Sequence, residues 1–186
     1  ATCLGDPGKS TYKKTRTANT IIDQVVERVL IDSETPYDII DFAPFGSDER
    51  QFCSPGFNLP FGVLMRTPFG QFPEYHTSAD NLNFIKEEFL FDSFKKYLEV
   101  IFILENNETY LNVNLMCEPH LRKNHLYSSL GALRLEELEN QAIFWLLNLS
   151  DGNNSLLDIS FRSKIKFRII NKIAALLYAN GLIKKC

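Results

Sequence analysis

A histidine stands in the stretch QFPEYHTSADNL, residues 71–82, between aromatic and small polar residues. An imidazole in such a loop can ligate a metal ion if the loop is rigid and the second ring nitrogen finds an acceptor. Pro73 stiffens the loop, and Asp80 either supplies that acceptor or caps a following helix. From the residues alone, a structural role for His76 is favoured over a role as metal ligand.

Acidic residues in two other turns could also carry chemistry. Asp6 stands in LGDPG, where it either binds a metal or forms an Asp-Pro turn, and the turn is favoured. In GSDERQF, the consecutive residues Asp48, Glu49 and Arg50 either line a cleft or form a solvated loop tip. In the cleft interpretation, Arg50 pairs with a substrate carboxylate. The sequence contains neither a glycine-rich phosphate loop nor a GxSxG elbow.

The elements around these residues predict an α/β layer fold with a mostly parallel sheet. Leu82, Ile85, Phe89, Phe94, Leu98 and Ile101 are expected to form the buried face of a long helix. Aromatic residues Phe45, Phe69, Phe72 and Tyr75 either wall a pocket, since ligands of open sheets bind near the ends of strands, or anchor the loops that carry them. Strands are predicted at 2–5, 37–42 and 61–67, helices at 19–32 and 81–105, and loops at 9–17, 43–60 and 68–80.

The C-terminal third predicts a winged helix. A connector with a short strand at 109–115 leads to three helices, a DGNN turn after the first of them, and a terminal strand in LIKKC. Ser155 is expected to cap the second helix and Gly181 to stop the third. The third helix is strongly apolar, so packing or oligomerisation is favoured over DNA contact, although its surroundings carry Arg162, Lys164, Lys166, Arg168, Lys172, Lys184 and Lys185.

Composition supports one ordinary domain plus a small module. The chain has 186 residues, 45% of them hydrophobic, and a formal net charge of −3, so no overall attraction to nucleic acid is expected. Its four cysteines form no CxxC pair, which favours free thiols in a reducing compartment such as the cytoplasm. No run of about 18 apolar residues occurs, so no membrane span is expected.

The segments TCLGDPGKSTYKKTRTANTIID, GSDERQFCSPGFNLPFGVLMRTPFGQFPEYHTSADNL and AIFWLLNLSDGNNSLLDIS, in this order, resemble a bacterial family of aminopeptidase-like proteins. The family joins a zinc-aminopeptidase-type α/β domain, with a mixed sheet and flanking helices, to a C-terminal winged helix, and is often associated with surface-polysaccharide gene clusters. The resemblance implies the C-terminal part of the aminopeptidase-like domain at 1–106, a connector at 107–132 and the winged helix at 133–186. It implies hydrolysis of a peptide or amino-acid amide bond.

The resemblance to di-zinc exopeptidases also implies two zinc ions and a glutamate general base. His76 matches the last histidine ligand and Asp6 the aspartate ligand that follows a strand. Asp48 matches the acid of the Ser-Asp loop, with Glu49, Arg50 and Tyr75 beside the substrate. The His-Asp pair and the Glu-Glu pair of that class are missing, and His120 and His125 fit no motif.

We therefore expect a fragment that is inactive alone, which in the whole protein acts on a peptide or amino-acid conjugate. The winged helix is expected to serve either packing within the protein or homo-oligomerisation. The alternative is a non-catalytic binding or regulatory protein whose winged helix contacts protein or DNA.

Overall fold

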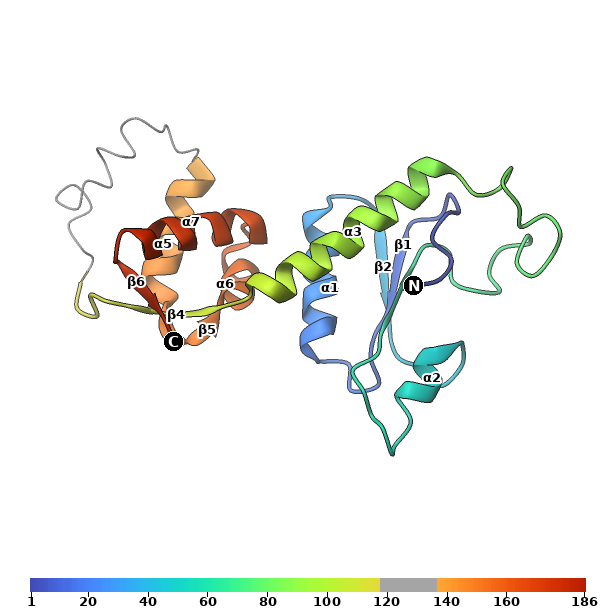
Figure 1. Cartoon of the computed structure of the whole chain (residues 1–186), viewed down its shortest axis with the longest axis horizontal. Coiled ribbons are helices and arrows are strands. Elements are labelled where there is room, and N and C mark those ends of the chain that lie inside the picture. Colours follow the sequence, from blue (N-terminus) through green and yellow to red (C-terminus); the bar gives the residue numbers. More distant parts are fainter. Residues whose placement is uncertain (118–136) are drawn as a thin grey trace. The chain divides into compact units, whose positions relative to one another are not determined.

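Two units divide the chain, residues 1–104 and residues 105–186 (Figure 1). The structure is a computed structural model that describes residues 1–117 and 137–186. The first unit is a mixed α/β fold and the second is a winged helix-turn-helix domain, as the sequence predicts. None of the helices in these described ranges is long and apolar enough to cross a membrane.

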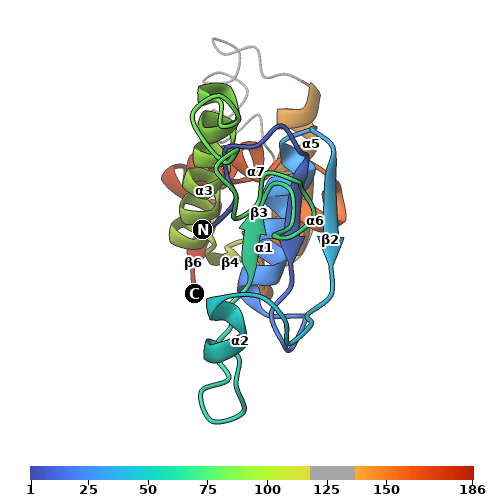
Figure 2. The same ribbon diagram turned by 90° about the vertical axis from the view of Figure 1, so that its right-hand side faces the viewer.

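A three-stranded mixed sheet organises the first unit. Its central strand β1, Ser10–Lys13, pairs in parallel with β2, Tyr37–Ile40, and antiparallel with β3, Val63–Met65. The expectation of a mostly parallel sheet is therefore wrong, because one of the two strand pairs is antiparallel. Figure 2 shows this unit from its end, with β2 and β3 both in view.

The position of β1 is the first departure from the sequence prediction. No strand forms at residues 2–5, and β1 lies inside the segment 9–17 that was expected to be a loop. All four β1 residues are buried although each side chain carries a polar group. Hydrophobic patterning overlooks such a strand, because burial here depends on polar partners elsewhere in the fold.

One of those partners is Asp23 in helix α1, Ile21–Asp32. Its carboxylate accepts hydrogen bonds from the Tyr12 hydroxyl at 2.9 Å, from the Thr15 backbone N–H at 2.8 Å and from the Thr15 hydroxyl at 2.6 Å. It also accepts from the backbone N–H of Thr20, the residue preceding the helix, at 2.8 Å. A single side chain thus caps α1 and fastens it to the end of β1.

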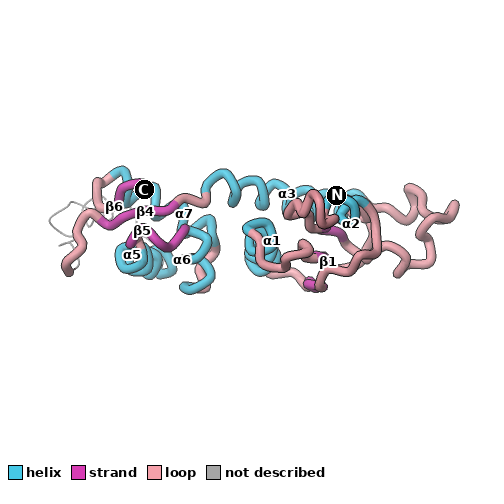
Figure 3. The backbone as a smooth tube through the Cα atoms, turned by 90° about the horizontal axis from the view of Figure 1, so that it is seen from below, coloured by secondary structure: helices cyan, strands magenta, loops and turns pink. Residues whose placement is uncertain are grey.

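The second long helix begins later than the sequence predicts. Helix α3 is Glu87–Asn106 rather than 81–105, and Figure 3 shows loop immediately before it. The Asn81 side chain bonds locally, accepting from the Asn83 N–H and donating to the Ser78 carbonyl, each at 2.9 Å. Such local bonds compete with helical ones, so the helix starts only after them. Asp80 therefore does not cap α3.

The buried face of α3 is also different from the prediction. Residues Ser93, Lys96, Val100 and Ile103 are buried, whereas Leu82, Phe94, Leu98 and Ile101 are exposed in the structure. Ser93 donates to the Leu4 carbonyl at 2.9 Å, and the Tyr97 hydroxyl donates to the Leu64 carbonyl at 2.6 Å. Polar contacts therefore determine which face of the helix is turned toward the sheet. The spacing of apolar residues in the sequence does not reveal this face.

The second unit has the winged-helix elements. Its sheet has the order β5-β4-β6, formed by Asp151–Ser155, Thr109–Asn112 and Ile183–Lys185. Its helices are α5, Glu137–Leu149, α6, Leu156–Ser163, and α7, Phe167–Ala179. The predicted DGNN turn is part of β5, so that expectation is wrong. The start of the predicted connector contributes β4, and its residues beyond 117, with His120 and His125, lie outside the described residues.

An apolar core holds this second unit together, and the predicted cap at Ser155 and stop at Gly181 are confirmed. The Ser155 hydroxyl accepts from the Asp158 N–H at 3.2 Å and so caps α6 as expected. Gly181 follows the end of α7 with a φ of +69°, the left-handed conformation that stops a helix. The core contains Leu146, Leu157, Phe167, Ile170, Ile173 and Leu177, all buried.

Replacing Asp23 by Asn should destabilise the first unit by about 2–3 kcal/mol, because an amide turns one acceptor oxygen into a donor facing other donors. The sole tryptophan, Trp145, lies in the second unit. Amide hydrogen exchange of α1 is therefore the suitable measurement. Asp41→Asn is the matched control, because the Asp41 side chain is 88% exposed. Equal protection of α1 in both variants would contradict the assignment.

The same carboxylate should make stability depend on pH. Burial acts to raise the pKa of Asp23, but the hydrogen bonds from Thr15 and Thr20 outweigh it and hold the pKa below its usual value. Its contribution is therefore complete above the unfolded pKa of about 3.9 and is lost as pH falls through the lower folded pKa. In Asp23→Asn, this part of the acid destabilisation should be absent from hydrogen exchange profiles.

Candidate functional site

The two loops that the sequence singles out meet around one surface depression. Phe45, Gly46 and Ser47 line it from the loop after β2, and Phe69–Gln71, Tyr75 and His76 line it from the loop after β3. Its volume is about 550 Å³. Three of the four aromatic residues expected as pocket walls therefore surround it. Phe72 instead packs its ring against Tyr75 and Phe84.

A buried ion pair holds the first of these loops. Lys13 Nζ lies 2.9 Å from Glu49 Oε1, and the two side chains are only 4% and 1% exposed. The same ammonium donates to the Phe45 carbonyl at 2.5 Å and lies 5.9 Å from the centre of the Phe69 ring. Lys13 thus ties β1 to both loops around the depression.

Glu49 bends its own loop around this pair. The residue lies in the short helix α2, Asp48–Phe52, and its second carboxylate oxygen accepts from the Ser47 N–H at 3.1 Å. A Cβ at Gly46 would come within 2.1 Å of Glu49 Oε1 and 2.6 Å of the Phe69 ring. Gly46 also has a φ of +138°, so glycine is required there on two grounds.

His76 occupies an exposed and strained position at the rim. Its φ is +58°, the left-handed region that costs a non-glycine residue about 1 kcal/mol. Its ring stacks on Tyr75 with centroids 4.1 Å apart and planes at 16°. His76 is therefore not packed in the core of the unit. Strain at an exposed side chain is typical of functional loops.

Asp6 anchors the loop that carries His76. The Asp6 carboxylate is buried and accepts from the Thr67 hydroxyl at 2.5 Å, the Thr67 N–H at 3.2 Å and the Gly8 N–H at 2.9 Å. At the other end of the loop, the Lys86 N–H donates to the Gly5 carbonyl at 3.0 Å. Both ends of the loop 67–86 are therefore bound to the segment around Asp6.

The remaining predicted site residues divide between surface and interior. Asp48 and Arg50 are exposed on α2, where a ligand can reach them, and Tyr75 is partly exposed. Glu49 is buried by Lys13 and faces away from solvent. The structure thus brings Tyr75 and His76 together at the depression, places Asp48 and Arg50 next to its loop, and uses Glu49 and Asp6 as internal supports.

The described residues do not form a complete metal centre. No group of three or more His, Cys, Asp or Glu side chains that could hold a metal occurs within 1–117 and 137–186. Asp6 has its oxygens engaged by Thr67 and Gly8, and His76 lies exposed against Tyr75.

Burial raises the pKa of the Cys3 thiol. The charges of Asp6 and Asp80 raise this pKa further, and the hydrogen bond with the Thr2 side chain lowers it.

The winged helix shows several of its basic side chains in ion pairs. Lys172 on α7 pairs with Glu139 on α5, and Lys185 on β6 lies 2.7 Å from Glu108. The apolar residues of α7 are mainly buried, as the sequence predicts. These contacts reduce the positive charge that the segment could offer to phosphate groups.

Sequence reasoning missed Lys13 and Arg66, which prove to be central to the first unit. The sequence prediction places Lys13 in a loop, although the run Ser-Thr-Tyr-Lys contains Thr and Tyr, which favour strands. Arg66 directly follows the apolar run Val-Leu-Met of β3 and is 7% exposed. A charged residue at the end of such a run is the signal that could have identified it.

Replacing Lys13 by Met should leave the Glu49 carboxylate buried without a cation and cost about 3–5 kcal/mol. The double variant Lys13→Met, Glu49→Leu should lose less than this, because it removes both charges. Hydrogen exchange of the α2 and β1 amides measures each loss. Lys14→Met is the control, since Lys14 pairs with the exposed Asp41 at 3.6 Å and should cost below about 1 kcal/mol. Equal losses for Lys13 and Lys14 variants would show that the buried pair does not hold the loop.

Comparison with known proteins agrees with this two-part organisation. A protein from Clostridium acetobutylicum, provisionally described as a polysaccharide biosynthesis protein with an aminopeptidase-like domain, is 50% identical over 184 residues. The match covers 99% of this chain and 42% of that protein. A crystal structure from the same organism, provisionally described as a peptidase, is 48% identical with a TM-score of 0.89, and the match covers 98% of this chain and 40% of that one.

The chain therefore spans about two fifths of the length of the relatives it matches. A family model described as winged helix-turn-helix matches residues 108–185, in agreement with the second unit. A second family model, described as a domain of unknown function (DUF4910), matches residues 1–107, more than half of the chain. The chain belongs to this DUF4910 family.

Proposed function

We propose that this chain forms part of an aminopeptidase-like hydrolase that acts on a peptide or amino-acid amide bond. The main observation in support is the depression at His76, where the two loops expected to flank such a site come together. The relatives described as peptidase and as aminopeptidase-like support the same class of activity. In this proposal the depression forms one wall of the substrate site.

The aromatic residues of the depression suit an apolar substrate side chain. Phe45 is 74% exposed, and Tyr75 presents a ring beside the His76 imidazole. Asp48 and Arg50 are available for charged groups of the substrate. Glu49 is assigned to the support of the loop, since its carboxylate is paired with Lys13 inside the protein. Binding thus combines apolar contact with charge recognition at the rim.

In this proposal the chain supplies only part of the ligand set for zinc. A zinc ion takes about four ligands, and the described residues offer His76 and Asp6, of which Asp6 also holds the loop base. These two side chains do not fit a complete two-zinc centre, so no catalytic step through a metal follows from them. We propose that further ligands and the general base come from outside this chain, and that the chain alone is inactive.

Zinc content and aminopeptidase activity test this proposal on the full-length gene product. About two zinc ions per chain are expected by elemental analysis. His76→Ala should lower metal affinity and activity by at least about tenfold. His120→Ala is the matched control, because His120 fits no ligand motif. Protein without zinc, or zinc content indifferent to His76, would remove His76 from the ligand set.

A second measurement separates the substrate wall from the metal. Phe45→Ser should raise KM for peptides with an apolar first residue by about tenfold, with zinc content unchanged, because it removes apolar contact at an exposed position. Phe57→Ser is a control, since Phe57 is similarly exposed at 71% and does not line the depression. An unchanged KM in the Phe45 variant would exclude the depression as a substrate wall.

A further inference from the structure

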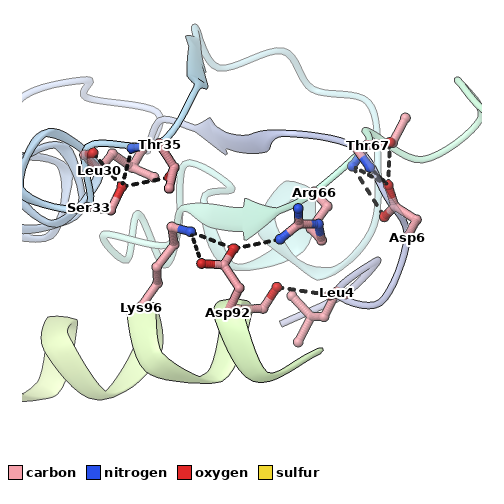
Figure 4. A network of polar contacts seen from close by, with 11 residues as sticks. Leu4, Asp6, Leu30, Ser33, Thr35, Arg66, Thr67, Asp92 and Lys96 are labelled. Carbon is pink, nitrogen blue, oxygen red and sulfur yellow. Dashed lines mark hydrogen bonds and ion pairs between the residues drawn. The ribbon is translucent and has the colours of Figure 1, made fainter. Parts of the chain in front are cut away.

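Helix α3 attaches to the rest of the first unit partly through polar side chains. Asp92 accepts hydrogen bonds from Arg66 and from Lys96, each at 2.6 Å (Figure 4). Ser93 and Lys96 are buried on this inner side of the helix. On an ordinary surface helix the inner side is apolar and the outer side is polar. The outer side of α3 departs from that pattern.

Large apolar side chains occupy the outer side of α3, and we call these residues the α3 stripe. They are Leu90, Phe91, Phe94, Leu98, Ile101 and Leu104, with exposed fractions between 42% and 58%. Their spacings of three and four residues place them on one side of the helix. Monomeric proteins seldom expose a contiguous apolar patch larger than a few hundred Å², and patches of that size mark interaction surfaces. The α3 stripe is therefore an interaction surface.

The sequence pattern indicates that this surface belongs inside a protein. Apolar spacing predicts Phe94, Leu98 and Ile101 to be buried, whereas all three are exposed in the structure. Val100 and Ile103 are buried on the opposite side of the same helix. A helix that is apolar on both sides is typical of one covered on both sides. The first unit covers one side of α3, so another layer is needed for the stripe.

The length of the relatives indicates what this layer is. The chain matches only 42% of the curated relative and 40% of the relative of known structure, although that structure has the same fold with a TM-score of 0.89. More than half of each relative is thus covalently joined to a unit like this one. Such a connection gives an effective concentration of about millimolar, which favours an attached segment over a free partner. The sheet is also open beside β2, whose outer edge pairs with no strand among the described residues.

We propose that the α3 stripe packs against apolar side chains from the part of the full-length gene product that lies outside residues 1–186. Helix α3 then lies between two layers of one folded protein. A second copy of the chain, or the winged helix of the same chain, would be a different occupant, and the experiments distinguish them. The stripe shares no residue with the depression at His76, so the inference does not rest on the proposed function.

Photo-cross-linking of the full-length gene product tests this proposal. The photoreactive residue p-benzoylphenylalanine replaces Phe94, and separately Phe91, because it keeps an aromatic ring at each position. We expect cross-links within one chain to peptides outside residues 1–186. The same residue in place of Phe57, which is 71% exposed and lies outside α3, measures the background yield. Cross-links that reach only a second copy or only residues 1–186, or yields no higher than the background, would overturn the proposal.

Thiol labelling of the same full-length protein measures the burial of the stripe without a bulky probe. In Leu98→Cys, and independently in Ile101→Cys, the introduced thiol should react with a maleimide at least about tenfold more slowly in native protein than in urea, because reaction requires local opening. Mass spectrometry separates it from the native thiols. Cys186 is exposed and should react rapidly in both conditions, and buried Cys53 reports that the first unit is folded. Equal native and urea rates with Cys53 protected would show that nothing covers the stripe.

Discussion

The first unit depends on a constraint set by its central strand, because β1 buries polar side chains that must all find partners. Tyr12 bonds Asp23 and Lys13 pairs with Glu49, at 2.9 Å in each case. The first contact fixes α1, and the second fixes the loop that enters α2. An unpaired buried polar group costs more than a hydrogen bond gains, so these partners are required by the strand. The helix and the candidate site are thus positioned by the same strand.

Both units have an apolar core, and in the first unit buried polar contacts join the elements as well. In the second unit, apolar side chains from α5, α6 and α7 fill a continuous core. In the first unit, the contacts between elements include the polar groups around Asp23, Glu49 and Asp92. Polar contacts are directional, so they hold loops in defined conformations that apolar packing alone would leave variable. This difference is consistent with placing the candidate site in the first unit.

The sequence predicts elements set by apolar or local contacts better than elements set by polar contacts with distant residues. Helix α1, strand β2, strand β6 and the cap at Ser155 were predictable because apolar periodicity and local capping determine them. Strand β1 and the rotation of α3 were not, because distant partners such as Asp23 and Leu64 decide them. The loops around His76 were identified from residue types and resemblance. That Phe45 meets Tyr75 and His76 at one depression required the folded chain.

The segment around Asp6 binds both the end of β3 and the loop that carries His76. The Thr67 contacts with Asp6 fix the start of the loop that carries His76, and the Arg66 N–H donates to the Cys3 carbonyl at 2.9 Å. Neighbouring residues at the end of β3 therefore hold Asp92 through Arg66 and begin the loop of the depression through Thr67. The position of His76 thus depends on the same strand end that binds α3 to the sheet, because its loop starts directly after Arg66.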